Sequence, residues 1–220
     1  MPLEMVEHRQ RDFLPAAGHD LFLPLYDPLV SLLGGDRARK ELIDQAKIEP
    51  GHRVLDIGCG TGTLMLLLKR RYPTLQTVGL DPDPKALRRA GNKARRAGVA
   101  VQLDQGFGDA LPYGSSTFDR VFSSFMFHHL EEENRENTLQ EVARVLKPGG
   151  SFHLLDFAGG EQGSHGLLGR FLHSHSRLKD NNAACILELM RRAGFSGGEK
   201  VNDSSMLFGL LRTSYYRATK

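Results

Sequence analysis

The chain has few cysteines, little net charge and no long apolar run. Among its 220 residues only Cys59 and Cys185 are cysteines, and neither looks like half of a disulfide, which is typical of a reducing compartment. The formal net charge of +3 does not indicate a dedicated nucleic-acid binder. No apolar stretch approaches the roughly 18 residues of a membrane span, and the polar segment 1–12 does not resemble a secretory signal. We therefore expect a cytoplasmic protein without nucleic-acid partners or an integral membrane segment.

What the chain does contain is typical of a globular domain with a substantial core. Apolar residues make up 40% of the sequence and charged residues 25%. Basic residues gather in two predicted helices, at 69–71 and 85–96. A solvated helix face explains such clusters more readily than a binding patch does.

Strands and helices alternate through the middle of the chain. The expected strands are 53–57, 76–80, 99–103, 118–123 and 151–157, and the expected helices are 36–47, 64–71, 85–97 and 131–146. This alternation predicts an α/β fold with a parallel sheet covered on both faces.

The two ends of the chain depart from that rhythm. Residues 22–33 form an apolar stripe broken by prolines, and we interpret residues 1–35 as an N-terminal helical lid over a main domain at 36–220. Residues 159–182 are rich in Gly, Ser and His, and we interpret them as a lid inserted near the substrate. After a helix at 184–193, two strands at 199–206 and 210–218 predict an antiparallel hairpin at the sheet edge.

The stretch Val54-Leu55-Asp56-Ile57-Gly58-Cys59-Gly60-Thr61-Gly62 is the strongest local signal. An apolar strand ends here in a turn with glycine at alternate positions, which lets the backbone turn sharply and a ligand contact the main chain. The dinucleotide fingerprint G-x-G-x-x-G would place its third glycine at position 63, where this chain has Thr63. The spacing therefore favours S-adenosylmethionine (SAM) over NAD as the cofactor.

Acidic residues follow the predicted strands, where open parallel sheets bind their ligands. Asp56 can accept from a ligand ammonium group, while backbone N–H groups of the glycine turn face a carboxylate. Asp81 can accept both hydroxyls of a ribose, although a helix N-cap is an alternative. Asp109 can accept from an adenine amino group with Ala110 beside the ring, although it is also a plausible loop residue.

The segment 123–130 follows the fourth strand and should line the same pocket. His128 and His129 are candidates for a general base, and a purely structural role is the alternative for each. Nearby cysteines or further histidines with ligand spacing are absent from the sequence, so we expect no metal site.

Together these motifs resemble class I SAM-dependent methyltransferases, and in particular the small-molecule enzymes similar to ubiquinone/menaquinone biosynthesis methyltransferases. The resemblance runs from about residue 36 to the C-terminal hairpin. It rests on the glycine turn at 54–62, on Asp81, and on the segments 108–112, 118–119 and 146–150. It implies a three-layer Rossmann-like fold with seven strands in the order 3-2-1-4-5-7-6 and strand 7 antiparallel.

The resemblance also implies the activity and the site. The expected reaction transfers a methyl group from SAM to an O, N or C atom of a small-molecule acceptor, leaving S-adenosylhomocysteine (SAH). Related natural-product enzymes implicate His128, His129 and Asp156 in proton removal. The expected cofactor contacts are Asp56, Gly58, Cys59, Gly60, Asp81, Pro82, Asp109, Ala110, Ser124 and Tyr26.

Two other functions remain open at this point, a non-catalytic SAM-binding protein and an NAD-dependent oxidoreductase. The sequence lacks the Pro-Cys nucleophile of cytosine methylation and the Pro-Pro-aromatic motif of amino-methylating nucleic-acid enzymes. It identifies neither the acceptor nor the oligomeric state, for which a monomer and a homodimer are both compatible.

Overall fold

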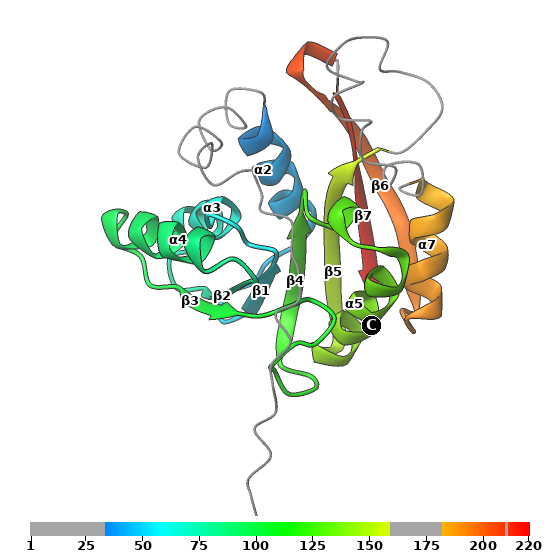
Figure 1. The fold of residues 1–220 in the computed structure, drawn as a ribbon, viewed down its shortest axis with the longest axis horizontal. Coiled ribbons are helices and arrows are strands. Elements are labelled where there is room, and N and C mark those ends of the chain that lie inside the picture. The colour runs from blue at the N-terminus through cyan, green and yellow to red at the C-terminus, as the bar shows by residue number, and fades with distance from the viewer. Residues whose placement is uncertain (1–33, 159–181, 210) are drawn as a thin grey trace, which may run out of the picture.

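The computed structural model describes residues 34–158, 182–209 and 211–220 (Figure 1). The elements are α2 (Gly35–Gln45), β1 (Arg53–Ile57), α3 (Thr63–Arg71), β2 (Gln76–Asp81), α4 (Pro84–Arg96), β3 (Gln102–Gln105), β4 (Phe118–Ser124), the 3-10 turn η2 (Phe127–His129), α5 (Glu132–Val145), β5 (Leu146–Phe157), α7 (Ala183–Arg192), β6 (Gly197–Met206), the 3-10 turn η4 (Leu207–Gly209) and β7 (Leu211–Thr219).

Seven strands form one sheet in the order β3-β2-β1-β4-β5-β7-β6. The central strand β1 pairs in parallel with β2 and β4, so that Leu55 lies beside Val78 on one side and Val121 on the other. Strand β7 is antiparallel to both β5 and β6. The predicted order and the antiparallel hairpin are confirmed.

Helices cover both faces of the sheet (Figure 1). On one face, Val54, Phe122 and Leu155 pack with apolar residues of α2 and α3. On the other, Leu55 and Leu154 belong to a cluster that includes α5 and α7. Consecutive strand residues point to opposite faces, which explains why apolar neighbours such as Val54 and Leu55, or Leu154 and Leu155, are both buried.

Two strand starts differ from prediction by three residues or more. Strand β3 begins at Gln102 rather than at Val99, because the Val99 N–H donates to the Ala94 carbonyl and keeps this stretch wound onto the end of α4. Strand β5 begins at Leu146, which pairs with Phe118 before the register shifts. The lysine-proline-glycine segment 147–150, expected between a helix and this strand, thus lies within the strand.

The helix predicted at 36–47 is observed at 35–45. The rest of the predicted N-terminal lid, and the predicted substrate lid up to residue 181, lie outside the described residues. No helix in the described ranges combines the length and apolar character needed to cross a membrane.

Candidate active site

The glycine turn joins β1 to α3 and is anchored to the end of β2. Gly58, Gly60 and Gly62 have φ values of +67°, +52° and +78°, a region that side-chain-bearing residues rarely adopt. The N–H groups of Gly58 and Cys59 both donate to the Leu80 carbonyl, at 2.8 and 3.0 Å. A side chain at Gly58 would also collide with Met126. The glycines are therefore required by backbone conformation and by close approach.

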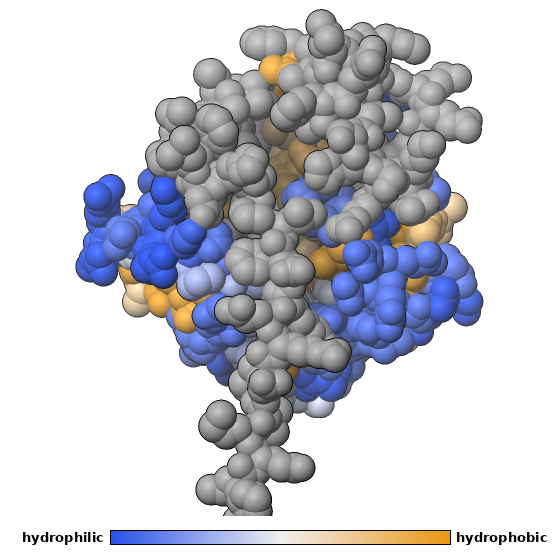
Figure 2. Space-filling view, in the orientation of Figure 1, coloured by the Kyte–Doolittle hydropathy of each residue, from blue (hydrophilic) through white to orange (hydrophobic). Residues whose placement is uncertain are grey.

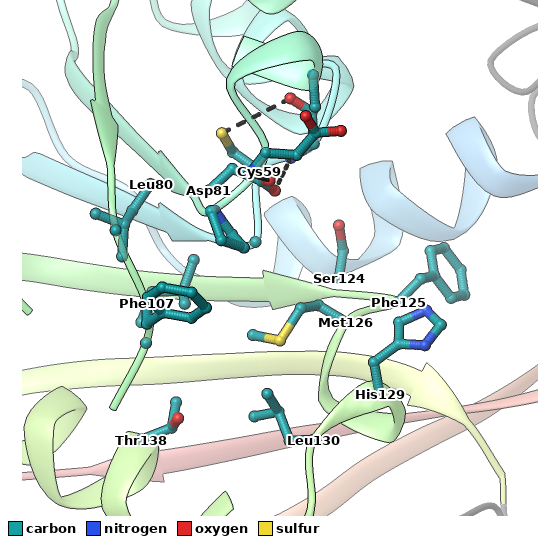
Figure 3. Close-up of a pocket in the computed structure, with 18 of the residues that line it drawn as sticks. Cys59, Leu80, Asp81, Phe107, Ser124, Phe125, Met126, His129, Leu130 and Thr138 are labelled. Carbon is teal, nitrogen blue, oxygen red and sulfur yellow. Dashed lines mark hydrogen bonds between the residues drawn. The ribbon is translucent and has the colours of Figure 1, made fainter. Parts of the chain in front are cut away.

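A cavity of about 610 Å³ opens at the carboxyl ends of the parallel strands (Figure 3). This volume lies within the range of roughly 300–1,000 Å³ that is usual for small-ligand sites. In Figure 3, Asp81 lies near the glycine turn, while His129 and Phe125 lie together on another side of the cavity. The wall combines the glycine turn, the ends of β2 and β4, the segment 106–109 and the start of α5.

Asp81 binds the glycine turn with one carboxylate oxygen and the start of α4 with the other. Its Oδ2 accepts from the Gly60 N–H at 2.8 Å, and its Oδ1 accepts from the Asp83 N–H at 2.9 Å. Burial raises the pKa of Asp81, and these two donors oppose the shift. The N-cap of α4 is Asp83, whose side chain accepts from the Lys85 N–H. The alternative of Asp81 as a simple helix cap is therefore wrong.

Asp56 lies behind the cavity wall, beneath the glycine turn. Its side chain is 1% exposed, and neither carboxylate oxygen has a hydrogen-bond partner among the described residues. Burial raises its pKa to about 8, and the Arg39 guanidinium opposes the shift. Arg39, itself buried, lines the cavity from α2. A buried carboxyl group and a buried guanidinium thus lie near enough to interact electrostatically at this end of the site.

The segment after β3 forms the opposite wall. Phe107 and Asp109 line the cavity, as predicted for Asp109 from its position after the strand. Ala110 is exposed and does not line the cavity, and the aromatic side chain of this segment that does line it is Phe107. The sequence carried a signal for Phe107, because an aromatic residue flanked by two glycines stands out in a polar loop.

His128, His129 and Asp156 come together beside the cavity. Asp156 is fully buried at the end of β5, and its Oδ1 lies 2.6 Å from His128 Nδ1. Its Oδ2 accepts from the His128 backbone N–H at 2.7 Å. The two imidazole rings pack with their centroids 4.0 Å apart, and His129 lines the cavity. Asp156 therefore fixes both the backbone and the ring of His128.

Phe125, just after β4, has a φ of +57°. A bulky residue in this region is strained, and such strain persists only where the surroundings impose it. Here the Phe125 N–H donates to the Leu155 carbonyl, and its ring packs against Phe157 and beneath the Arg39 guanidinium. With this backbone conformation, Phe125 and Met126 lie in the cavity wall.

Most of the predicted cofactor residues share this cavity. Its lining includes Gly58, Cys59, Gly60, Asp81, Pro82, Asp109 and Ser124. Burial and the neighbouring acids raise the pKa of the Cys59 thiol, so that it behaves as a small apolar group. Tyr26 lies outside the described residues.

Sequence reasoning missed Arg39, although a signal existed. Arg39 shares the 3.6-residue spacing of Leu42, Ile43 and Ala46, the buried face of α2. A charged residue on an apolar helix face is rarely buried without a partner or a function.

SAM joins an amino-acid end, which carries an ammonium and a carboxylate group, to an adenosine. The site offers partners for each of these parts. Asp56 offers two buried acceptor oxygens with no partner in the described ranges, and Asp81 offers a carboxylate in the wall. Arg39 and the glycine turn supply donors for a carboxylate. The residues present therefore fit SAM.

Residues 54–150 match a protein family described as a methyltransferase domain. A demethylmenaquinone methyltransferase from Thermus thermophilus is 38% identical over 150 residues, covering 67% of this chain and 67% of that protein. Its counterpart from Deinococcus radiodurans is 35% identical over 155 residues, covering 69% of this chain and 64% of that protein. The chain thus spans about two thirds of the length of these curated relatives.

A solved structure supports the fold. Phosphoethanolamine N-methyltransferase 2 from Haemonchus contortus, determined in complex with SAM, aligns with a TM-score of 0.77 at 18% identity, covering 93% of this chain and 58% of that one. The chain belongs to the class I SAM-dependent methyltransferase family, in the group similar to the menaquinone biosynthesis enzymes, and its cofactor is SAM.

Proposed function

We propose that this chain methylates a hydroxylated aromatic ring of the quinol type. The proposal rests on the hydrogen bonds between Asp156 and His128 at the edge of the cavity. The names of the relatives from Thermus thermophilus and Deinococcus radiodurans, both demethylmenaquinone methyltransferases, support the acceptor class. Apolar side chains of the cavity wall suit a ring, namely Phe107, Phe125, Met126 and Leu130.

We assign the two ends of the cofactor to different walls. Asp81 is proposed to accept from the ribose hydroxyls and Asp109 from the adenine amino group. At the amino-acid end, Asp56 is proposed to accept from the ammonium group, while Arg39 and the glycine turn donate to the carboxylate. Asp81, Asp109 and Arg39 all line one cavity. Asp56 lies behind its wall, near enough to Arg39 to interact electrostatically, and both observations support this orientation.

When bound, SAM supplies an electrophilic methyl group that a nucleophilic acceptor atom displaces in line. The contribution of the protein is orientation together with removal of a proton. Because a carboxylate only accepts, Asp156 holds the neutral His128 ring with its proton on Nδ1. The lone pair on Nε2 is then available as the base. His129, stacked on His128 and lining the cavity, is proposed to contact the acceptor.

The required oxidation state of the acceptor follows from electron balance. A ring carbon or oxygen must donate an electron pair to the methyl group and lose one proton. An oxidised quinone ring is electron-poor, whereas a deprotonated quinol is electron-rich. We therefore expect methylation of the reduced ring only.

The proposal is tested by incubating the chain with SAM and a 2-unsubstituted naphthoquinol, kept reduced, followed by mass spectrometry. We expect a product heavier by one methylene unit, and no product from the oxidised quinone. Asp156→Asn should lower turnover by about 10²–10⁴-fold while leaving SAH affinity unchanged. Affinity for SAH without methylation of any reduced ring would favour the non-catalytic alternative. A larger loss with His129→Asn than with His128→Asn would reverse the assigned roles.

A further inference from the structure

Helix α4 contacts the glycine turn directly through one basic residue. This helix carries six basic residues and no acidic one, and the molecule is hydrophilic on that side (Figure 2). Among them, Lys93 is half-buried and reaches across to the turn. Its Nζ donates to Thr61 Oγ1 at 3.2 Å and to Thr63 Oγ1 at 3.0 Å. Lys93 therefore has a specific partner set that a solvated helix face does not require.

A second contact holds the same turn of α4 against the glycine segment. A Cβ at Gly62 would lie only 2.9 Å from the Ala90 Cβ, so the two backbones approach closely. Ala90 also packs with Cys59 and Met65 in a small apolar cluster. Because Ala90 and Lys93 are three residues apart, they lie on the same face of α4. The turn is thus held by an apolar contact and a charged one side by side.

The ammonium group of Lys93 determines which partner donates in its hydrogen bonds to Thr61 and Thr63. An ammonium group has three donors and no acceptor, so each threonine hydroxyl must accept from Lys93 and direct its own proton elsewhere. Both threonines line the cofactor cavity. Thr63 is also the first residue of α3, where the helix dipole is positive. Placing a cation there is unfavourable by itself, so the contact depends on the two hydroxyl groups that accept from Lys93.

We propose that Lys93 is a positioning residue for the cofactor. It holds the Thr61 and Thr63 hydroxyls as donors and keeps the glycine turn in the conformation that receives the cofactor's carboxylate end. Lys93 acts through the turn and does not itself line the cavity. Its contribution should therefore appear in cofactor affinity and should depend on the two hydroxyls.

The test is a double-mutant cycle read by calorimetric titration with SAH, which suits a chain without tryptophan. Lys93→Met should weaken SAH binding by about tenfold, the size of a typical coupling within one hydrogen-bond network. In a Thr61→Val, Thr63→Val background the same substitution should have little further effect. Lys93→Arg, which keeps charge and donors, should recover most of the affinity.

Arg88→Met is the matched control, because it removes an exposed cation from the same helix, and SAH affinity should not change. Circular dichroism and thermal melting of each ligand-free variant report folding. If Lys93→Met does not fold, Lys93→Gln replaces it in the cycle.

Unchanged affinity in the Lys93 variant, or equal losses in both backgrounds, would overturn the proposal. A loss that vanishes in 0.5 M salt would also overturn it, because screening at that ionic strength removes a general attraction between charges but not a positioning contact.

Discussion

Two buried acids at neighbouring strand ends have opposite surroundings. Asp81 accepts from two backbone N–H groups, which oppose the rise in its pKa that burial causes. Asp56 has no hydrogen-bond donor among the described residues, and burial raises its pKa to about 8. A carboxyl group in that state is costly in the empty protein and valuable when a cationic ligand arrives. Asp81 thus holds the glycine turn, whereas Asp56 is proposed to accept from the ammonium group of the cofactor.

The roles of Asp81 and His128 lead to a comparison of two alanine variants. Asp81→Ala removes a charged acceptor, one hydrogen bond to the glycine turn and one to the start of α4, so SAM affinity should fall by about 10–100-fold. His128→Ala should change SAM affinity far less, because His128 is proposed to act on the acceptor and not on the cofactor. Calorimetric titration of both variants measures the difference. Equal losses would mean that the two roles are misassigned.

Asp56→Asn should separate stability from binding. The folded pKa of Asp56 is raised above its unfolded value, so the stability linked to its protonation is present at low pH and lost as pH rises through about 8. Asparagine cannot ionise and avoids that loss. The ligand-free variant should therefore melt higher than the parent at pH 9 and bind SAM more weakly at every pH. A lower melting temperature at pH 9 would contradict the assignment.

At the scale of elements, two polar residues of β5, His153 and Asp156, lie in different surroundings. Asp156 ends the strand at the cavity, whereas His153 lies inside the sheet, stacked on Phe122. His153 Nε2 is 2.9 Å from the Ser151 hydroxyl. Burial is the main cause that lowers the pKa of His153 to about 3, and the nearby Arg120 and Arg217 contribute to the same shift. One strand thus holds a site residue and a buried neutral histidine.

The buried His153 should make the fold sensitive to acid. Its folded pKa is below the unfolded value near 6.5, so the unfolded chain binds a proton first. The corresponding stability is present above pH 6.5 and lost as pH falls toward 3. His153→Leu should flatten the decline in unfolding free energy between pH 6.5 and 4 by up to ~1.4 kcal/mol per pH unit. Urea titrations across this range measure the slopes, and identical slopes would argue against the prediction.

At the scale of the whole molecule, the cavity is assembled from every layer. Its wall takes residues from α2, the glycine turn, the segment after β3, the end of β4 and the start of α5. A ligand that touches all of these should bind the folded chain and not the unfolded one.

Cofactor binding should accordingly stabilise the entire domain. At a hundredfold excess over its dissociation constant, SAH should contribute about 2.7 kcal/mol, which corresponds to a rise in melting temperature of roughly 5–10 °C. NAD at the same concentration should cause no shift. Differential scanning calorimetry checks both, and a shift with NAD alone would contradict the choice of cofactor.

The turn, the alternation of strands and helices and the cofactor class followed from sequence because they depend on short-range patterns, whereas the strand order was implied by the family resemblance. Glycine spacing, alternating periodicity and the hairpin signal each act over a few residues. Ala110 was misplaced for a complementary reason, since the path of an irregular loop is set by what packs around it. Arg39 was missed because its place in the cavity wall depends on how α2 packs beside the glycine turn.

What the sequence by itself determined is the SAM-type glycine turn and the alternation that builds the sheet, because local backbone preferences dictate both. Only the tertiary structure decided which side chains share the cavity. It brought Arg39 to Asp56, His128 to Asp156 and Lys93 to the glycine turn. These pairs are distant in the chain, and their proximity comes from packing rather than from any local pattern.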